Sequence, residues 1–224
     1  MKTLYFWLMT KNAVIAGKIA EALLQIKAIK LQPNAPFTWA SGWKSPIYCD
    51  NRLVLSHPAA RKLVYQSFAE TIRREYPDAE VLAGVATGAI AHGVLVAEEM
   101  GLPFVYVREK SKAHGRQNQV EGEVRPGQKV VIIEDLISTG KSSLAAFEAL
   151  KEAGCEILGM TAIFSYQFEE AKNNFQNAAC TLVTLSDYTE LISQAARSGY
   201  ITEDQITMLS DWRKSPSTWN NESL

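Results

Sequence analysis

The residues best suited to chemistry in this sequence lie in one short stretch, VVIIEDLISTGKS, from Val130 to Ser142. Two adjacent carboxylates, Glu134 and Asp135, follow an apolar β-branched run that is typical of a strand buried on both faces. The loop after them holds hydroxyls and a glycine, and a helical pattern begins at Ser142. Backbone N–H groups at such a strand–loop–helix corner favour a phosphate. Because carboxylates repel phosphate, the ligand is expected to carry hydroxyls as well, as a ribose does, or a divalent cation.

This stretch has two other interpretations. Residues 139–142 look like the end of a P-loop, but that motif requires a glycine where this chain has Asp135, and no acidic metal-binding strand is evident elsewhere. An ordinary strand–helix turn with a Ser/Thr cap is the plainer alternative. It gives no reason for two acids at the end of an apolar strand.

Residues 130–142 resemble the phosphoribosyl-pyrophosphate (PRPP) binding motif of the type I phosphoribosyltransferases. The resemblance implies that Glu134 and Asp135 bind the ribose hydroxyls. It also implies that the turn expected over Leu136–Lys141, together with the first helical residue, binds the 5-phosphate mostly through backbone N–H groups. The residues assigned to this phosphate site are Leu136, Ile137, Ser138, Thr139, Gly140, Lys141 and Ser142.

A long polar loop, predicted over residues 108–124, carries several cations, and loops of this length are often lids. A solvated basic loop is the alternative, but cations beside a diphosphate ester could stabilise departing pyrophosphate. The loop resembles the catalytic loop of the orotate phosphoribosyltransferases. This implies catalytic and PRPP-binding roles for Arg108, Lys112 and His114, with Lys110 as a supporting candidate.

Residues 37–52 resemble the orotate-binding N-terminal segment of the same branch, and they are expected to form a compact hood. Lys44 and Ser138 are assigned to orotate. Many members have a lysine at the position of Ala40, so in this chain that contact is either missing or supplied by Lys44. Three aromatic side chains could either stack on the base or pack within the hood: Phe37, Trp39 and Trp43.

A loop of small residues follows the first predicted sheet strand, at Gly84–Ala89. It resembles the pyrophosphate loop of the family, in which a strained peptide turns N–H groups toward the ligand. Thr87 and Gly88 are therefore assigned to PRPP. Some members have a lysine here and an arginine where this chain has Ser165–Gln167, so the backbone is expected to contribute more in this chain.

The elements that must position these residues alternate between strand and helix, which predicts an α/β fold with a central parallel sheet flanked by helices. Ligands in such sheets bind beyond the carboxyl ends of the strands. The expected organisation is an N-terminal helix and hood (1–52), a type I phosphoribosyltransferase core (53–190) and a C-terminal helical extension (191–224). Helices are predicted at 12–29, 58–75, 89–100, 142–153 and 167–175, and strands at 81–85, 104–107, 129–134, 156–164 and 180–184.

The composition excludes several classes of protein. A formal net charge of −1 over 224 residues gives no reason to expect nucleic-acid binding. Three widely spaced cysteines predict neither a disulfide framework nor a zinc site and favour the cytoplasm. The apolar run at residues 3–9 is too short to span a membrane, and Met9 is an alternative first residue.

Taken together, the resemblance implies a pentosyltransferase that makes orotidine 5-phosphate and pyrophosphate from orotate and PRPP, in de novo pyrimidine (UMP) biosynthesis. It implies Mg²⁺ held mainly by PRPP, with no direct protein side-chain ligand, and a homodimer with shared sites.

Two rival functions are a purine or uracil phosphoribosyltransferase and a non-catalytic PRPP-sensing regulator. The orotate-like loop and hood argue against the first. The length and charge of the chain argue against the second, because they leave no room for a DNA-binding domain or a strongly basic face.

Overall fold

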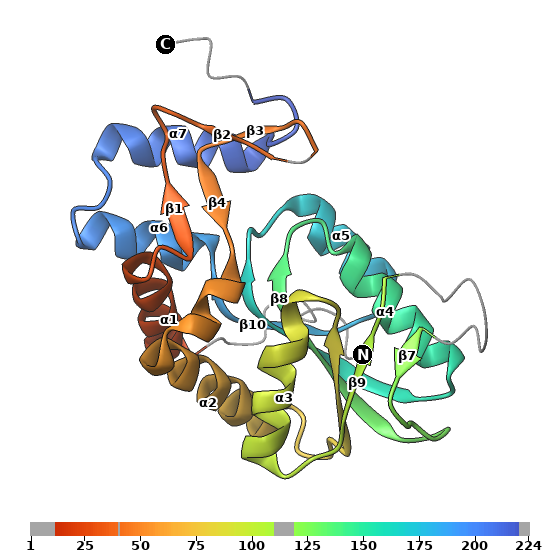
Figure 1. Ribbon diagram of the computed structural model, residues 1–224. Coiled ribbons are helices and arrows are strands. Elements are labelled where there is room, and N and C mark those ends of the chain that lie inside the picture. Colours follow the sequence, from red (N-terminus) through yellow and green to blue (C-terminus); the bar gives the residue numbers. More distant parts are fainter. Residues whose placement is uncertain (1–11, 40, 110–118, 220–224) are drawn as a thin grey trace, which may run out of the picture.

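The computed structural model describes residues 12–39, 41–109 and 119–219. Its centre is a six-stranded sheet with the order β10-β9-β8-β5-β6-β7 (Figure 1). Neighbouring strands pair in parallel except at the β7 edge, where β7 runs antiparallel to β6. The strands are β5 (Val81–Val85), β6 (Phe104–Val107), β7 (Val120–Glu121), β8 (Lys129–Ile137), β9 (Glu156–Ser165) and β10 (Leu182–Asp187).

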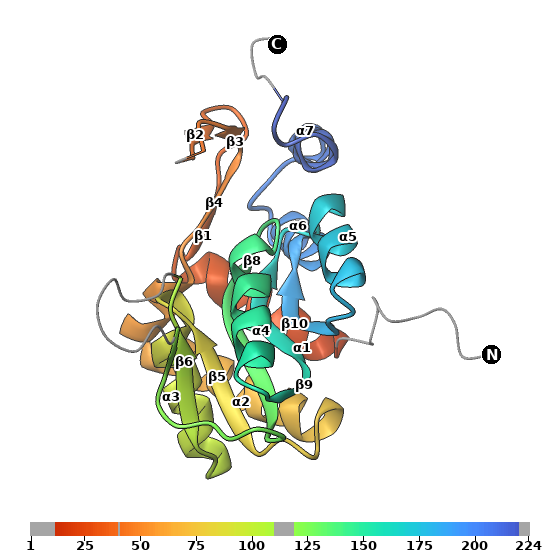
Figure 2. The ribbon, with the colours of Figure 1, turned by 90° about the vertical axis from the view of Figure 1, so that its right-hand side faces the viewer.

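Helices cover both faces of the sheet, as Figures 1 and 2 show. Successive side chains of the strands point alternately into two apolar cores, one on each face of the sheet, as expected for strands buried on both faces. In β5, Leu82 joins one core, while Val81 and Ala83 join the other. The first core is covered by α1 (Ala13–Gln25), α2 (Pro58–Glu75) and α3 (Gly88–Met100), and the second by α4 (Lys141–Glu152) and α5 (Glu169–Asn177).

The hood is an antiparallel arm that rises above the sheet next to the C-terminal helices (Figure 2). Trp212 is fully buried between them, with its ring against Trp39, and its Nε1 donates to the Lys44 carbonyl at 3.2 Å. Trp39 therefore packs within the hood. The elements are β1 (Ile29–Leu31), β2 (Phe37–Thr38), β3 (Lys44–Ser45), β4 (Ile47–Cys49), the 3₁₀ helix η1 (Asn51–Ser56), α6 (Tyr188–Arg197) and α7 (Glu203–Lys214).

The predicted α/β class and the strands at 81–85 and 104–107 are confirmed, but several boundaries were wrong. The helix predicted at 167–175 is Glu169–Asn177, and the strand predicted at 180–184 is Leu182–Asp187. The first helix ends at Gln25 rather than near 29, because Lys27 has a positive φ of 58° and Ile29 enters β1. Strand β8 continues to Ile137, which shortens the predicted turn. The long polar loop also is not wholly irregular, since its end forms β7. Among the described residues, no helix is long and apolar enough to cross a membrane.

Candidate active site

The two predicted ribose ligands lie on the last part of β8, where it extends past the end of β5. Glu134 is buried, with 4% of its surface exposed. Its Oε2 accepts the Ser143 hydroxyl at 2.7 Å and its Oε1 accepts the Asp135 backbone N–H at 2.9 Å. Burial, followed by the charge of Asp135, raises the pKa of Glu134 well above that of an ordinary carboxyl. Asp135 is half-buried, so its carboxylate is the more accessible of the two.

The predicted phosphate corner follows directly. Leu136 and Ile137 pair with β9 as strand residues, and the Ile137 side chain is fully buried, so the irregular turn begins only at Ser138. Gly140 caps α4 with φ 78°, and a Cβ there would lie 2.6 Å from the Phe175 ring. Glycine meets both constraints at this position.

Several contacts hold this corner in place. The Asn174 Nδ2 on α5 donates to the Thr139 carbonyl at 2.9 Å. The Lys141 Nζ forms an exposed ion pair with Glu170 at 2.8 Å. The lysine charge is therefore shared with α5, and the first turn of α4 presents its backbone N–H groups to an anion.

The small-residue loop meets the carboxylates from the neighbouring strand. Thr87 is exposed, and the Ala86–Thr87 peptide is cis. A Cβ on Gly88 would overlap the Asp135 carboxylate, so this glycine permits the close approach of the two loops. The parallel order of β5 and β8 thus places the predicted pyrophosphate and ribose residues side by side.

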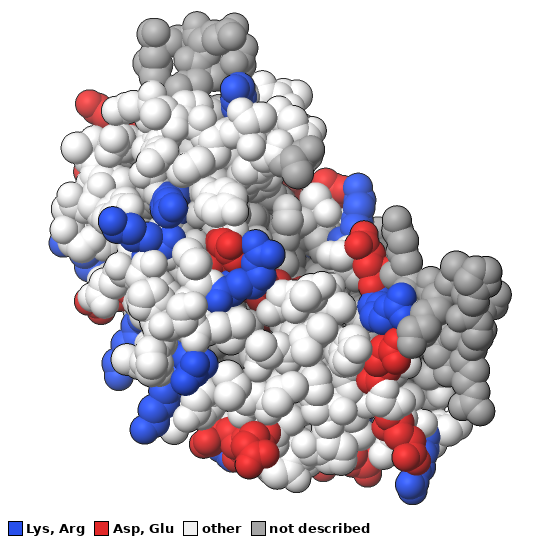
Figure 3. Space-filling view, in the orientation of Figure 1, with Lys and Arg blue, Asp and Glu red and all other residues white. Residues whose placement is uncertain are grey.

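These loops border a cavity of about 360 Å³ between the sheet and the base of the hood. In Figure 3, acidic and basic side chains meet near the middle of this face. A concave site with convergent polar groups is the expected form of a small-ligand site. The cavity is lined by Cys49, Asp50, Arg52, Val85, Ala86, Thr87, Gly88, Glu134, Asp135, Leu136 and Ser142.

The sequence resemblance places residues 37–52 in an orotate-binding segment, but it indicates no individual role for the hood residues at this cavity. Asn51 is buried, and its Nδ2 donates to the Asp135 carbonyl at 2.6 Å, which ties the hood to the end of β8. The Cys49 thiol donates to the Asn51 Oδ1 at 3.4 Å, and the buried His92 ring lies 3.3 Å from the Asn51 carbonyl. The consecutive polar residues at 50–52, directly after an apolar strand, were the available signal.

The other predicted site residues are spread more widely. Arg108 follows β6, and its guanidinium pairs with Glu121 of β7 at 3.1 Å. Lys44 lies in the β2–β3 hairpin, its Nζ donates to the Thr38 hydroxyl, and it does not line the cavity. Lys112 and His114, like Lys110 and Ala40, lie outside the described residues.

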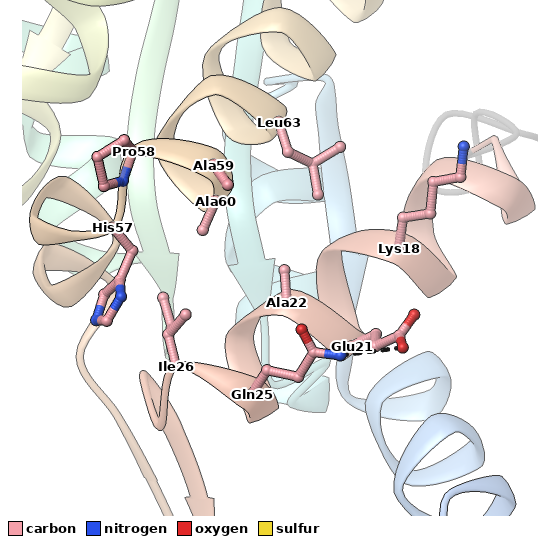
Figure 4. A pocket seen from close by; sticks show the side chains of 10 residues that line it. All are labelled: Lys18, Glu21, Ala22, Gln25, Ile26, His57, Pro58, Ala59, Ala60 and Leu63. Atoms are coloured by element: carbon pink, nitrogen blue, oxygen red, sulfur yellow. Dashed lines mark hydrogen bonds between the residues drawn. The ribbon is translucent and has the colours of Figure 1, made fainter.

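A larger hollow of about 500 Å³ lies elsewhere, between α1 and the start of α2 (Figure 4). Its polar groups include Lys18, His57 and the hydrogen-bonded pair Glu21–Gln25. No residue predicted from the sequence to bind a ligand lines it. We assign the chemistry to the smaller cavity, because the carboxylates and the two loops converge there.

Comparison with known proteins agrees with this geometry. Residues 54–185 match the phosphoribosyl transferase domain family. The orotate phosphoribosyltransferase of Porphyromonas gingivalis is 57% identical over 90% of this chain and 96% of its own length. The solved UMP synthase of Leishmania donovani is 27% identical with a TM-score of 0.75, over 88% of this chain and 42% of that longer one. The orotate phosphoribosyltransferase of Aeropyrum pernix shares the fold, with a TM-score of 0.71 and 24% identity over 82% of this chain and 99% of that one.

Proposed function

This chain belongs to the orotate phosphoribosyltransferases, and from that premise we propose how its cavity serves the reaction. The enzyme transfers ribose 5-phosphate from PRPP to orotate and releases pyrophosphate, a step of pyrimidine biosynthesis. The observation that carries the site assignment is the meeting of the β8 carboxylates with the Thr87–Gly88 loop at one cavity.

The reaction is a substitution at the anomeric carbon of the ribose. A ring nitrogen of orotate forms the new C–N bond, and the electron pair of the breaking C–O bond leaves with pyrophosphate. In our proposal, Asp135 accepts hydrogen bonds from the ribose hydroxyls, with Glu134 behind it. The corner at residues 138–142 holds the 5-phosphate. The protein thereby contributes positioning and charge stabilisation, and orotate needs no strong general base.

We assign the remaining roles on the family resemblance. Arg108, Lys112 and His114 would meet the charge that grows on departing pyrophosphate. Lys44 and Ser138 would bind orotate. The Lys44 Nζ donates one hydrogen bond to the Thr38 hydroxyl, and an ammonium group has two further N–H donors for orotate.

Magnesium fits this cavity, because Asp135 brings carboxylate oxygen atoms of the kind that Mg²⁺ prefers. When bound with PRPP, the ion supplies positive charge to the diphosphate. Within the described residues no cluster of three or more metal-ligating side chains occurs, and we propose that PRPP oxygens hold the ion.

We also propose that the enzyme is a cytoplasmic homodimer. The described cysteines are all unpaired, which is typical of a reducing compartment.

The test is a spectrophotometric assay of orotate loss with PRPP and Mg²⁺, run beside adenine, hypoxanthine and uracil. We expect turnover of orotate alone, loss of activity with a chelator and recovery with added Mg²⁺. Turnover of another base in preference to orotate would contradict the proposed substrate. A large fall in the melting temperature of the ligand-free protein with chelator would reveal a structural metal and contradict the proposed metal binding.

A further inference from the structure

The cavity has an unfavourable charge balance for the ligand proposed above. The carboxylates of Asp50 and Asp135 line it beside the buried carboxyl group of Glu134, whereas PRPP carries a diphosphate and a phosphate. Among the described residues that line the cavity, Arg52 is the single cation. A binding site for a multiply charged anion needs positive charge or N–H donors close to that anion.

The Arg52 side chain is held in a defined orientation by its neighbour Asp50. Its Nε donates to Asp50 Oδ1 at 2.7 Å and its Nη2 donates to Oδ2 at 2.9 Å, which is the bidentate geometry of an arginine–carboxylate pair. Asp50 in turn caps η1 by accepting the Arg52 backbone N–H at 3.2 Å. The ion pair and the cap together fix the Arg52 side chain relative to the start of η1.

One edge of the guanidinium stays open. The Arg52 side chain is 63% exposed, and its Nη1 donates no hydrogen bond to any of the described residues. An exposed ion pair of this kind adds little to the stability of the fold. Its fixed orientation at a cavity wall is better explained by binding, because a pre-oriented guanidinium loses less side-chain entropy when it meets an anion.

We propose that Arg52 is a substrate-binding residue whose open guanidinium edge contacts the diphosphate of PRPP, with Asp50 as the residue that orients it. This inference rests on the proposed function for the identity of the ligand. The diphosphate is the favoured contact because the Thr87–Gly88 loop, assigned to pyrophosphate, lines the same cavity, and because planar guanidinium groups match phosphate oxygens in pairs.

The experiment measures binding by calorimetry for three ligands: Mg²⁺-pyrophosphate, Mg²⁺-PRPP and orotidine 5-phosphate, which has no diphosphate. We expect Arg52→Ala to weaken pyrophosphate and PRPP about tenfold or more and to leave orotidine 5-phosphate nearly unchanged. Arg52→Lys should give part of this loss, because lysine keeps the charge but lacks the planar guanidinium group. Asp50→Asn should also give part of it, because the charged partner that orients Arg52 is removed.

Arg125→Ala is the matched control. Arg125 also forms an exposed ion pair, with Glu123, but it lies just before the first residue of β8, at the end of the strand opposite to the carboxylates. Unchanged pyrophosphate binding by Arg52→Ala would overturn the proposal. So would an equal loss for orotidine 5-phosphate, which would place Arg52 on the base or the sugar phosphate. Orotate turnover by the wild-type enzyme tests the proposed function separately, because the pyrophosphate titration does not depend on which base is used.

Discussion

Adjacent carboxyl groups at the end of β8 have different surroundings, and this difference suggests a division of labour. Asp135 is accessible from the cavity, whereas Glu134 is buried and bonded to Ser143. We therefore expect Asp135 to act directly on the ribose and Glu134 to act largely through the local structure.

Asp135→Asn should leave the fold intact and weaken the use of PRPP. A charged acceptor for a ribose hydroxyl is lost, which costs about 1.5–3 kcal/mol, or roughly 10–150-fold in kcat/KM for PRPP. Steady-state kinetics at limiting PRPP measure this change, and the melting temperature serves as the control for folding. Wild-type activity in the purified variant would show that the ribose assignment is wrong.

Glu134→Gln should stabilise the ligand-free protein at neutral pH and above. The raised pKa means that the folded state disfavours the ionised form more than the unfolded chain does. The unfolding free energy of the wild type therefore falls as pH rises from the ordinary carboxyl range through the raised folded value, by about 1.4 kcal/mol per pKa unit. Glutamine stays neutral, and it can keep both hydrogen bonds because the Ser143 hydroxyl can also accept.

Melting temperatures of both proteins across pH 4–9 test this expectation. The variant should melt higher than the wild type near pH 8, and the difference should shrink toward pH 4, where the wild-type carboxyl is also neutral. A constant difference across the range would mean that ionisation of Glu134 contributes nothing to the pH dependence of stability.

At the scale of elements, the notable connection runs between the hood and the sheet. The buried Asn51, at the start of η1, donates to the Asp135 carbonyl across 84 positions of sequence. Because the bond is to the backbone, it fixes the peptide that carries the proposed ribose ligand. The same short helix, η1, also carries Arg52. It therefore borders the cavity and fixes the backbone next to the carboxylates.

Asn51→Ala should raise the KM for PRPP and lower stability together. The Asp135 carbonyl would lose a buried donor, which costs about 1–3 kcal/mol. Unfolding by denaturant gives the stability change, and kinetics at varied PRPP give the functional one. If stability fell but the KM and kcat for PRPP stayed at wild-type values, Asn51 would be a packing residue without a positioning role.

At the scale of the whole molecule, the cationic loop is the feature that bears on how subunits cooperate. The loop leaves β6 at Arg108 and returns through β7, at the edge of the sheet. The family resemblance predicts that this loop reaches the site of a second subunit, so that two subunits share each site.

Mixing two variants tests that arrangement, once each alone is confirmed to be nearly inactive at limiting PRPP. Lys112→Ala should lower kcat far more than orotate affinity, because the lysine is expected to meet charge present only as pyrophosphate leaves. Mixed with Asp135→Asn, it should form heterodimers in which one site carries both lesions and the other carries none. Activity should therefore reappear. No recovery, with subunit exchange demonstrated by tagged chains, would mean that the loop serves its own subunit.

The sequence by itself determined the class of fold and the carboxylate corner, because these depend on local patterns. Three features follow one another closely in the sequence: the buried strand at 130–133, the acids at its end, and Gly140 before a helix. Their order alone therefore predicts a strand–loop–helix corner with two carboxylates. Apolar runs ending in small or acidic residues likewise predicted which strand ends face the ligand. Boundaries failed where tertiary pairing decided them: β9 extends β8 to Ile137, and β6 orders the pair of residues in β7.

Only the tertiary structure decided which hood residues reach the cavity. Asn51 and Arg52 lie more than 80 positions before the carboxylates, and no local periodicity indicates that they meet. Their placement follows from the path of the hood, whose β4 strand pairs with β1 and delivers η1 to the end of β8. Long-range contacts of this kind depend on how the elements pack together, and hydrophobic patterning within each element does not specify them.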